Sequence, residues 1–312
     1  MQFRFPDRIP VEINVLPATW SLHGRAMDEL VERFPSLFGD RPRQRYTDTA
    51  AQAKYVEGDY VDAWGCVWSN VRTGMASIVT HHPVPTREDV HSLRVPDANE
   101  GLPHGFMYLR LCDLRGFEEL MLDFAEEPPE LQMLIDIVLA YNLRQLKNMK
   151  LAQRSSPEII RFGDDLGMQR SLPISPQKWR KYLKPCFAEL YGRCRDAGHW
   201  VYMHTDGHVV EIIPDLIECG VKVLNLQVGA NGFDSLAETC KGKICVHLDL
   251  DRQQFPFFTA DDINDHVREA VERLGSPNGG LWLQAEIGPD VPLRNVETLC
   301  IALEKYKSYY RH

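Results

Sequence analysis

Residues 159–204 read IIRFGDDLGMQRSLPISPQKWRKYLKPCFAELYGRCRDAGHWVYMH, and this stretch decides the fold class. Its two apolar runs, IIRFG (159–163) and WVYMH (200–204), flank a helical pattern. Ser175, followed by a proline, marks the start of that helix, and Gly198 marks its end. Both runs are too apolar for strands with one wet face. We therefore expect two strands that are buried on both faces and joined in parallel by a helix.

The same alternation of β-rich runs and helical patterns fills the chain from about residue 100 onward. The other runs are FMYLRL (106–111), VKVLNL (221–226), ICVHL (244–248) and GLWLQA (280–285), and they too are expected to be buried on both faces. Further strands are expected near 9–17 and 76–82, and further helices over 129–150 and 259–275. This order predicts an α/β protein with a parallel sheet. A (β/α)8 barrel is the first choice and a doubly wound open sheet the second. No GxGxxG or GxxxxGK[ST] phosphate loop follows a strand, which argues against the open sheet.

The totals describe one globular chain. Its 312 residues are 44% hydrophobic and 25% charged, which is enough apolar material for a large core. A single (β/α)8 barrel of this size is common, so we predict one domain over residues 1–312. Residues 40–100 are irregular and rich in proline and tryptophan, and we interpret them as an N-terminal elaboration of the barrel and not as a separate domain.

Charge and cysteine content exclude several classes of function. The chain has 35 basic and 44 acidic residues, a formal charge of -9, so its field repels nucleic acids and anionic membranes. We find no apolar run long enough to span a bilayer and no signal-peptide pattern in the first residues. The eight cysteines form no CxxC pair. We therefore expect a cytoplasmic protein with reduced thiols that is neither exported nor inserted in a membrane.

Polar side chains gather where predicted strands end, and these ends form the active site of a barrel. The three ends carry Asp164 and Asp165; His204, Asp206 and His208; and Gln284, Glu286 and Asp290. Residues at i and i+2 of a strand share a face, so His204 and Asp206 are expected within about 6–7 Å of each other, close enough to bind one ion.

Structural explanations for the same residues stay open. A carboxylate after a strand often caps the next helix. For Asp206, and for one of Asp164 and Asp165, this capping role fits the sequence as well as a functional role does. His208 is expected to be exposed. The two tryptophans of DAWGCVW (62–68) either form an aromatic plug or line a substrate pocket. Cys219 and Cys245 are expected to fill core space.

Several phrases, taken in order, resemble the uroporphyrinogen decarboxylase superfamily. They are DAWGCVW (62–68), LRGFEELMLDFAEEPPELQMLID (114–136), FGDDLGMQRSLPISPQKWRKYLKPCF (162–187), HTDGHVVEIIPDLIECGVKVLNLQ (204–227) and VPLRNVETL (291–299). The similarity runs from about residue 10 to the C-terminus and is strongest to the decarboxylase-like branch that includes corrinoid methyltransferases. The resemblance implies a (β/α)8 barrel.

The chain departs from two patterns of that superfamily. True uroporphyrinogen decarboxylases carry an arginine-rich RQAGR phrase that grips substrate carboxylates, whereas the matching LPATWSLHGRAM (16–27) contains only Arg25. Thiol-methylating members bind zinc through His-x-Cys and a later cysteine. Here the first pair is His204 and Asp206, and the later position falls near Ala285 or Glu286. The histidine is kept and the thiolates are not, and a histidine with carboxylates forms a harder ligand set, which suits a Lewis acid that polarises oxygen.

The resemblance thus implies metal-assisted methyl transfer from a small O- or N-methyl substrate to a corrinoid. In this interpretation zinc or a similar divalent ion is held by His204, Asp206 and Glu286, and Asp164, Asp165 and His204 are the catalytic candidates. Substrate-binding candidates are Trp64, Trp68, Gln169 and Gln227. The alternatives are a cofactor-independent decarboxylase or other lyase, with Asp164 or Asp165 as the acid, and a binding barrel without catalysis. The partners considered are the small-molecule substrate, a corrinoid protein and a second copy of the chain in a homodimer.

Overall fold

The computed structural model describes all residues except 1–2, 39–55, 74–75, 98–100, 150–156 and 311–312. The chain divides into two compact units, which we describe separately. Unit 1 combines Met1–Thr49 with Val223–His312, and unit 2 is Ala50–Lys222. The predicted elaboration over 40–100 lies partly outside the described residues, and the prediction of a single domain stays a prediction.

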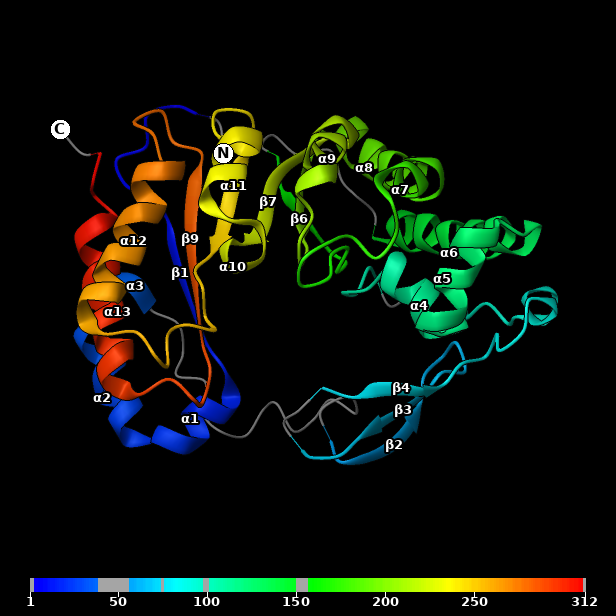
Figure 1. Ribbon diagram of the computed structural model, residues 1–312, viewed down its shortest axis with the longest axis horizontal. Coiled ribbons are helices and arrows are strands. Elements are labelled where there is room, and N and C mark those ends of the chain that lie inside the picture. Colours follow the sequence, from blue (N-terminus) through cyan, green and yellow to red (C-terminus); the bar gives the residue numbers. More distant parts are fainter. Residues whose placement is uncertain (1–2, 39–55, 74–75, 98–100, 150–156, 311–312) are drawn as a thin grey trace. The chain divides into compact units, whose positions relative to one another are not determined.

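Unit 1 is built on a parallel sheet with strand order β1-β9-β8-β7 (Figure 1). Its strands are β1 (Val11–Val15), β7 (Val221–Gln227, which begins just before the unit boundary), β8 (Cys245–Asp249) and β9 (Leu281–Ile287). Its helices are α1 (Pro17–His23), α2 (Arg25–Arg33), α3 (Pro35–Phe38), α10 (Val228–Asn231), α11 (Phe233–Cys240), α12 (Ala260–Leu274) and α13 (Leu293–Tyr306). Helix α12 starts with a capping box in which Thr259 and Asp262 bond each other's backbone.

The two faces of the unit 1 sheet differ in polarity. In β9, Leu281, Leu283 and Ala285 are buried, whereas Trp282 and Gln284 between them are only partly buried. The expectation that the 280–285 run is apolar on both faces is therefore wrong. One face of β9 carries buried aliphatic side chains, and the other carries an indole and polar groups.

Unit 2 contains a parallel pair of strands, a small antiparallel sheet and a set of helices. The strands are β2 (Gly58–Val61), β3 (Val67–Asn70), β4 (Ile78–His81), β5 (Ile159–Gly163) and β6 (Trp200–His204). The helices are η3 (Glu88–Ser92), α4 (Tyr108–Arg115), α5 (Phe117–Glu126), α6 (Pro129–Asn148), α7 (Pro176–Tyr182), α8 (Lys184–Asp196), η4 (Val210–Ile212) and α9 (Ile213–Cys219).

The βαβ unit predicted from residues 159–204 is confirmed. Strands β5 and β6 pair in parallel, from Ile159 beside Trp200 to Gly163 beside His204. Ser175 caps α7 by accepting a hydrogen bond from the backbone N–H of Lys178. The single helix expected over 175–198 is two helices, α7 and α8, because a proline lies in the first turn of α8 and cannot continue the hydrogen bonds of α7. The α/β fold class of parallel strands and crossover helices is confirmed.

Two of the expected strands have a different structure. The 76–82 run contains β4, but β4 pairs antiparallel with β3 in the small sheet and does not join the parallel one. The 106–111 run is not a strand, because α4 begins at Tyr108. Tyr108, Leu111 and Leu114 are buried at helical spacing, so tertiary contacts outweigh the β propensity of the run.

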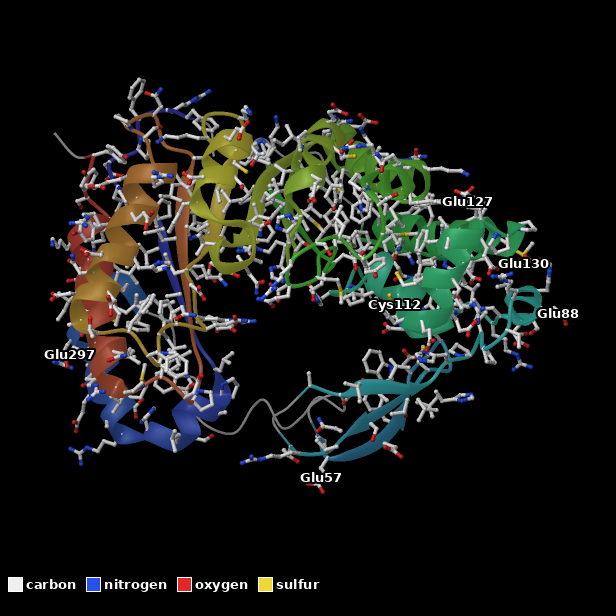
Figure 2. The ribbon with its side chains drawn as sticks, viewed as in Figure 1. Glu57, Glu88, Cys112, Glu127, Glu130 and Glu297 are labelled. Carbon is white, nitrogen blue, oxygen red and sulfur yellow. The ribbon has the colours of Figure 1, made fainter. Side chains whose placement is uncertain are left out.

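The cysteines are all free. Seven are buried, and Cys112 on α4 is partly buried (Figure 2). Cys219 and Cys245 are each 2% exposed, which confirms that they fill core space. Burial raises the pKa of Cys219 to about 11, as expected for an unreactive thiol. None of the described helices combines the length and apolar character needed to cross a membrane.

Candidate active site in unit 2

Strands β5 and β6 end side by side, and each is followed by polar residues. Gly163 and His204 are partners in the parallel ladder, so Asp165 and Asp206 emerge from the same edge of the sheet. The backbone N–H of Asp206 donates a hydrogen bond to Oδ1 of Asp165 at 3.1 Å. The two loops that carry the carboxylates are thereby tied together.

His204 lies between the two carboxylates. Its Nε2 is 3.6 Å from Oδ1 of Asp165 and 3.6 Å from Oδ1 of Asp206. The side chains of His204 and Asp206 are therefore neighbours, as their i, i+2 spacing suggests. About 30% of each of these three side chains is exposed, so the group is accessible from solvent.

His104 completes the cluster and is absent from the candidates named from the sequence. Its Nε2 is 3.2 Å from Oδ2 of Asp165, and its ring centroid is 5.3 Å from that of His204. Asp165 thus bridges two imidazoles, one at each carboxylate oxygen. We call His104, Asp165, His204 and Asp206 the histidine–aspartate cluster.

The charges in this cluster support one another. The hydrogen bond with Asp165 raises the pKa of His104, against the effect of burial. Burial alone would raise the pKa of Asp165, but the hydrogen bond with His104 and the nearby His204 lower it below its ordinary value. The cluster therefore favours an ionised Asp165 beside a protonated His104 when no metal ion competes for them.

His104 could have been predicted as a site residue only if the segment after it, residues 106–111, had been predicted as a helix. A strand over 106–111 would place His104 before the amino end of that strand, away from the edge where barrel sites form. Because the segment is instead helix α4, the loop that precedes it is free to reach the ends of β5 and β6. The backbone N–H of Gly105 donates to the carbonyl of Gly163 at 2.7 Å, which fixes the loop there.

Glycines make this close approach feasible. A Cβ at Gly163 would lie 2.6 Å from Nδ1 of His104, and one at Gly207 would lie 2.3 Å from the backbone of Gly167. Gly207 also has a φ of +81°, which an L side chain rarely adopts. The loops after β5 and β6 can touch only because neither Gly167 nor Gly207 has a side chain.

We expect Gly163→Ala to displace His104 without unfolding the protein, since only one partly exposed imidazole must move. The affinity for zinc should fall by about tenfold, the effect typical of disturbing a ligand's support. Isothermal titration of metal-stripped protein would measure it. Gly192→Ala in α8 is the matched control, because its Cβ would meet only Arg195 at 3.8 Å, and it should bind zinc as the wild type does. Equal affinities for the two variants would contradict this assignment of His104.

Asp164 has a structural position that differs from that of its neighbour. It is 0% exposed, and its carboxylate accepts hydrogen bonds from the backbone N–H groups of Met107 (3.2 Å), Tyr108 (2.5 Å) and Leu109 (2.9 Å). Burial raises the pKa of Asp164 to about 7, while the bonds from Leu109 and Tyr108 act in the opposite direction. The carboxylate caps the first turn of α4, which matches the capping alternative for one of the two aspartates. Its catalytic role stays a prediction.

The donor atoms of the cluster fit a divalent metal ion. One ligand atom each from His104, Asp165 and His204 lies within 4.8 Å of the other two. Ligands of a tetrahedral zinc ion, at bond lengths of about 2.0–2.1 Å, are roughly 3.3 Å apart. Asp165 approaches His104 with Oδ2 at 3.2 Å and His204 with Oδ1 at 3.6 Å, so each histidine is near this spacing from one of the two carboxylate oxygens. Imidazole nitrogen with carboxylate oxygen is a donor set that zinc accepts.

The two tryptophans predicted to line a pocket are held in a separate group around Asp62. Oδ1 of Asp62 accepts from the backbone N–H groups of Trp64 and Cys66, both at 2.9 Å. Its Oδ2 accepts from Nε1 of Trp68 at 3.0 Å and from Arg110 at 3.1 Å. This network gives the DAWGCVW segment a fixed turn at the edge of the small sheet.

Both tryptophans also have aromatic neighbours. Trp64 is 3% exposed and packs edge-on against Tyr141 at 4.7 Å, so the aromatic-plug interpretation describes it well. Trp68 is partly exposed and stacks on Tyr60 at 6.1 Å. Gln169 is exposed in the loop after β5. Contact of these residues with a substrate stays a prediction.

The remaining candidates belong to unit 1. Glu286 lies on β9, where it pairs with Arg252 and accepts a hydrogen bond from Asn14 at 3.1 Å. Gln227 ends β7 beside Asp249, and its backbone carbonyl accepts from Asn231. The metal-ligand role of Glu286 and the substrate role of Gln227 stay predictions. His208, expected to be exposed, is partly buried and pairs with Glu211 at 3.1 Å.

The sequence matches one family model over residues 109–306, which is more than half of the chain. This model describes uroporphyrinogen decarboxylase. The chain belongs to the uroporphyrinogen decarboxylase family. The match includes β5, β6 and three members of the histidine–aspartate cluster, whereas His104 precedes it. The resemblance stated from the sequence phrases is thereby confirmed. No curated protein matches the sequence.

Solved structures give distant likenesses. A B12-independent methionine synthase from Shewanella sp. W3-18-1, in complex with selenomethionine, is 12% identical over 81% of this chain and 74% of its own, at a TM-score of 0.42. The dihydropteroate synthases of Xanthomonas albilineans and Yersinia pestis are 13% and 18% identical, at TM-scores of 0.33 and 0.34. Each of those two matches covers 55% of this chain, and the chain spans only 59% and 63% of their lengths. At this distance the likenesses say nothing about the reaction.

Proposed function

We propose that this member of the uroporphyrinogen decarboxylase family is a metal-assisted methyltransferase. It would move a methyl group from a small O- or N-methyl compound to a corrinoid carried by a partner protein. The observation that carries the proposal is the histidine–aspartate cluster, which joins two imidazoles and two carboxylates at the carboxyl ends of β5 and β6. The corrinoid and its carrier come from the family resemblance.

The composition of the cluster favours an oxygen or nitrogen leaving group. A methyl ether or methylamine is a poor methyl donor until its heteroatom is polarised or protonated. A zinc ion held by His104, His204 and Asp165 or Asp206 would supply that polarisation. Carboxylates make the site harder than the thiolate sites of thiol-methylating relatives, which suits oxygen better than sulfur.

The residues of the chain have separate roles in this scheme. His104, in the loop before α4, and His204, at the end of β6, would hold the ion. Asp165 would be a third ligand, and before an ion binds it keeps both imidazoles in place, since each of its oxygens faces one of them. Asp206 faces His204 and is positioned to bind the ion or the substrate heteroatom.

The direct test is a zinc titration of metal-stripped protein. We expect about one ion to bind per chain, because the two groups of histidine and carboxylate ligands found among the described residues share His204. Isothermal calorimetry gives the stoichiometry, and X-ray absorption at the zinc edge would report nitrogen and oxygen neighbours without sulfur. Protein that takes up no zinc would rule out the proposed mechanism.

A carboxy-lyase is the second candidate, and one observation favours it. The pKa of His104 is raised, and its side chain is 47% exposed, so it can present a proton to a bound carbanion. Such an enzyme would protonate the carbon that has lost carbon dioxide and would need no metal. Its activity would be indifferent to chelators, whereas the methyltransferase would lose activity in a chelator and regain it with zinc.

A further inference from the structure

A histidine holds the start of the loop that joins β8 to α12, residues 250–259, which we call the β8–α12 loop. The backbone N–H of Asp251 donates a hydrogen bond to Nε2 of His266 on α12 at 3.0 Å. A ring nitrogen accepts a hydrogen bond only through its lone pair, so His266 is neutral in this arrangement and carries its proton on Nδ1. An imidazolium has an N–H group at both nitrogens. No rotation of a protonated ring would therefore restore the acceptor.

Aromatic side chains surround the imidazole of His266. The ring centroids of Phe233 on α11 and of Phe258 in the β8–α12 loop each lie 5.6 Å from that of His266. The ring centroid of Phe255, which is 1% exposed, lies 6.5 Å away. Phenylalanine rings offer no hydrogen bonds in place of water, so a charged imidazole would lose part of its hydration here without compensation.

The charge that acts on this imidazole is the carboxylate of Asp251, which favours the protonated ring. On α12 itself, Asp262 lies one turn before His266 and bonds the helix cap, and Glu269 lies in the next turn and is exposed. Burial outweighs the effect of Asp251 and lowers the pKa of His266 below its ordinary value. The neutral ring is thus the form that the closed loop favours.

Acid favours the open loop. In the closed loop the pKa of His266 is lowered, whereas an imidazole that meets water in an open loop has its ordinary pKa of about 6.5. The open form therefore binds a proton more readily than the closed form. The closed loop has its full stability above about pH 6.5 and loses it as the pH falls through the lowered pKa.

The two ends of the β8–α12 loop are held by different kinds of group. Arg252 follows the bonded residue directly, and its guanidinium pairs with Glu286 on β9. The far end is held by Asn295 on α13, whose Nδ2 donates to the backbone carbonyls of Phe255 at 2.7 Å and of Phe258 at 3.0 Å. An amide does not titrate, so the response to acid is confined to the end that carries Arg252.

We propose that His266 is an acid-sensitive latch on the β8–α12 loop. The neutral imidazole keeps the start of the loop closed, and its protonation in mild acid opens the loop and separates Arg252 from Glu286. The loop follows the carboxyl end of a strand of the parallel sheet, the edge at which α/β enzymes bind their substrates. The inference concerns unit 1 alone and holds whether or not the histidine–aspartate cluster binds zinc.

The test is hydrogen exchange of the full chain, followed by mass spectrometry on peptides that cover residues 250–258. After correction for intrinsic exchange rates, the protection of the wild-type loop should fall at least about fivefold between about pH 7.5 and about pH 5, as linkage to one histidine requires. His266→Gln offers an amide oxygen in place of Nε2 and does not titrate, so its protection should be the same at both pH values. His266→Phe keeps a ring but has no acceptor, and its loop should be weakly protected at both.

His91→Gln is the matched control, because it removes an exposed histidine on η3 and should leave the pH dependence of the loop as in the wild type. Peptides from α13, measured in the same samples, should keep their protection because the opening is local. Equal protection of the wild-type loop at both pH values would overturn the proposal. So would a simultaneous loss of protection in α13, which would indicate acid unfolding of the unit, or a His266→Gln protein that retains the wild-type pH dependence.

Discussion

His204→Ala should abolish stoichiometric zinc binding and lower methyl transfer to cobalamin by at least about a thousandfold. The imidazole is the one group of the cluster that faces both carboxylates, with Asp165 and Asp206 each 3.6 Å from its Nε2. Its removal leaves His104 and Asp165 as the only paired members, too few to hold zinc against water. A Lewis acid supplies several kcal/mol of transition-state stabilisation, which converts to losses of this size.

The fold should survive this change. His204 is partly exposed at the end of β6, so truncation opens no cavity in the core. His208→Ala is the matched control, since it removes the same side chain four residues further along, where the imidazole pairs with Glu211. Zinc content and turnover should stay close to wild type in the control. A His204→Ala protein that keeps both its zinc and its turnover would contradict the assignment, and wild-type activity that chelators leave unchanged would favour the lyase.

The sequence predicts part of this site because strand geometry is local. The i, i+2 spacing of His204 and Asp206 after an apolar run suffices to place both on one face, and the parallel order of the strands brings Asp165 to the same edge. Nothing local distinguishes Asp164 from Asp165. They are adjacent in sequence, and only the position of α4 makes one a buried cap and leaves the other to bridge two histidines.

His104 and the polar face of the unit 1 sheet show a second limit on what can be predicted from the sequence. The 106–111 run has strong β propensity, yet its backbone N–H groups are taken by Asp164, some fifty residues later in the chain. Hydrophobic periodicity is a local signal and does not report contacts between residues so far apart in the sequence. The alternation in LWLQAEI was present in the sequence, but the apolar character of the GLWLQA run (280–285) suggested burial on both faces.

Asp164→Asn should lower the free energy of unfolding by about 3 kcal/mol, even though the change is nearly isosteric. Three backbone N–H groups at the start of α4 donate to the carboxylate, and an amide can offer only one oxygen to them. At a site that is 0% exposed no water replaces the lost acceptor, so at least one donor stays unsatisfied at a cost of about 1–3 kcal/mol, in addition to the lost charge-assisted bond. The urea midpoint and the thermal midpoint, both followed by circular dichroism, would measure the loss.

Asp165→Asn is the matched control for Asp164→Asn and should show the opposite profile. Its side chain is 30% exposed and accepts from one backbone N–H, that of Asp206, so its unfolding free energy should stay within about 1 kcal/mol of wild type. Its zinc affinity should fall by at least about tenfold, because the bridging carboxylate between His104 and His204 is gone. If instead Asp164→Asn leaves stability unchanged and removes activity, Asp164 contacts the substrate and the capping role is secondary. The two variants distinguish the roles of these adjacent aspartates, because the free energy of unfolding reports the helix cap at Asp164 and the zinc affinity reports the cluster at Asp165.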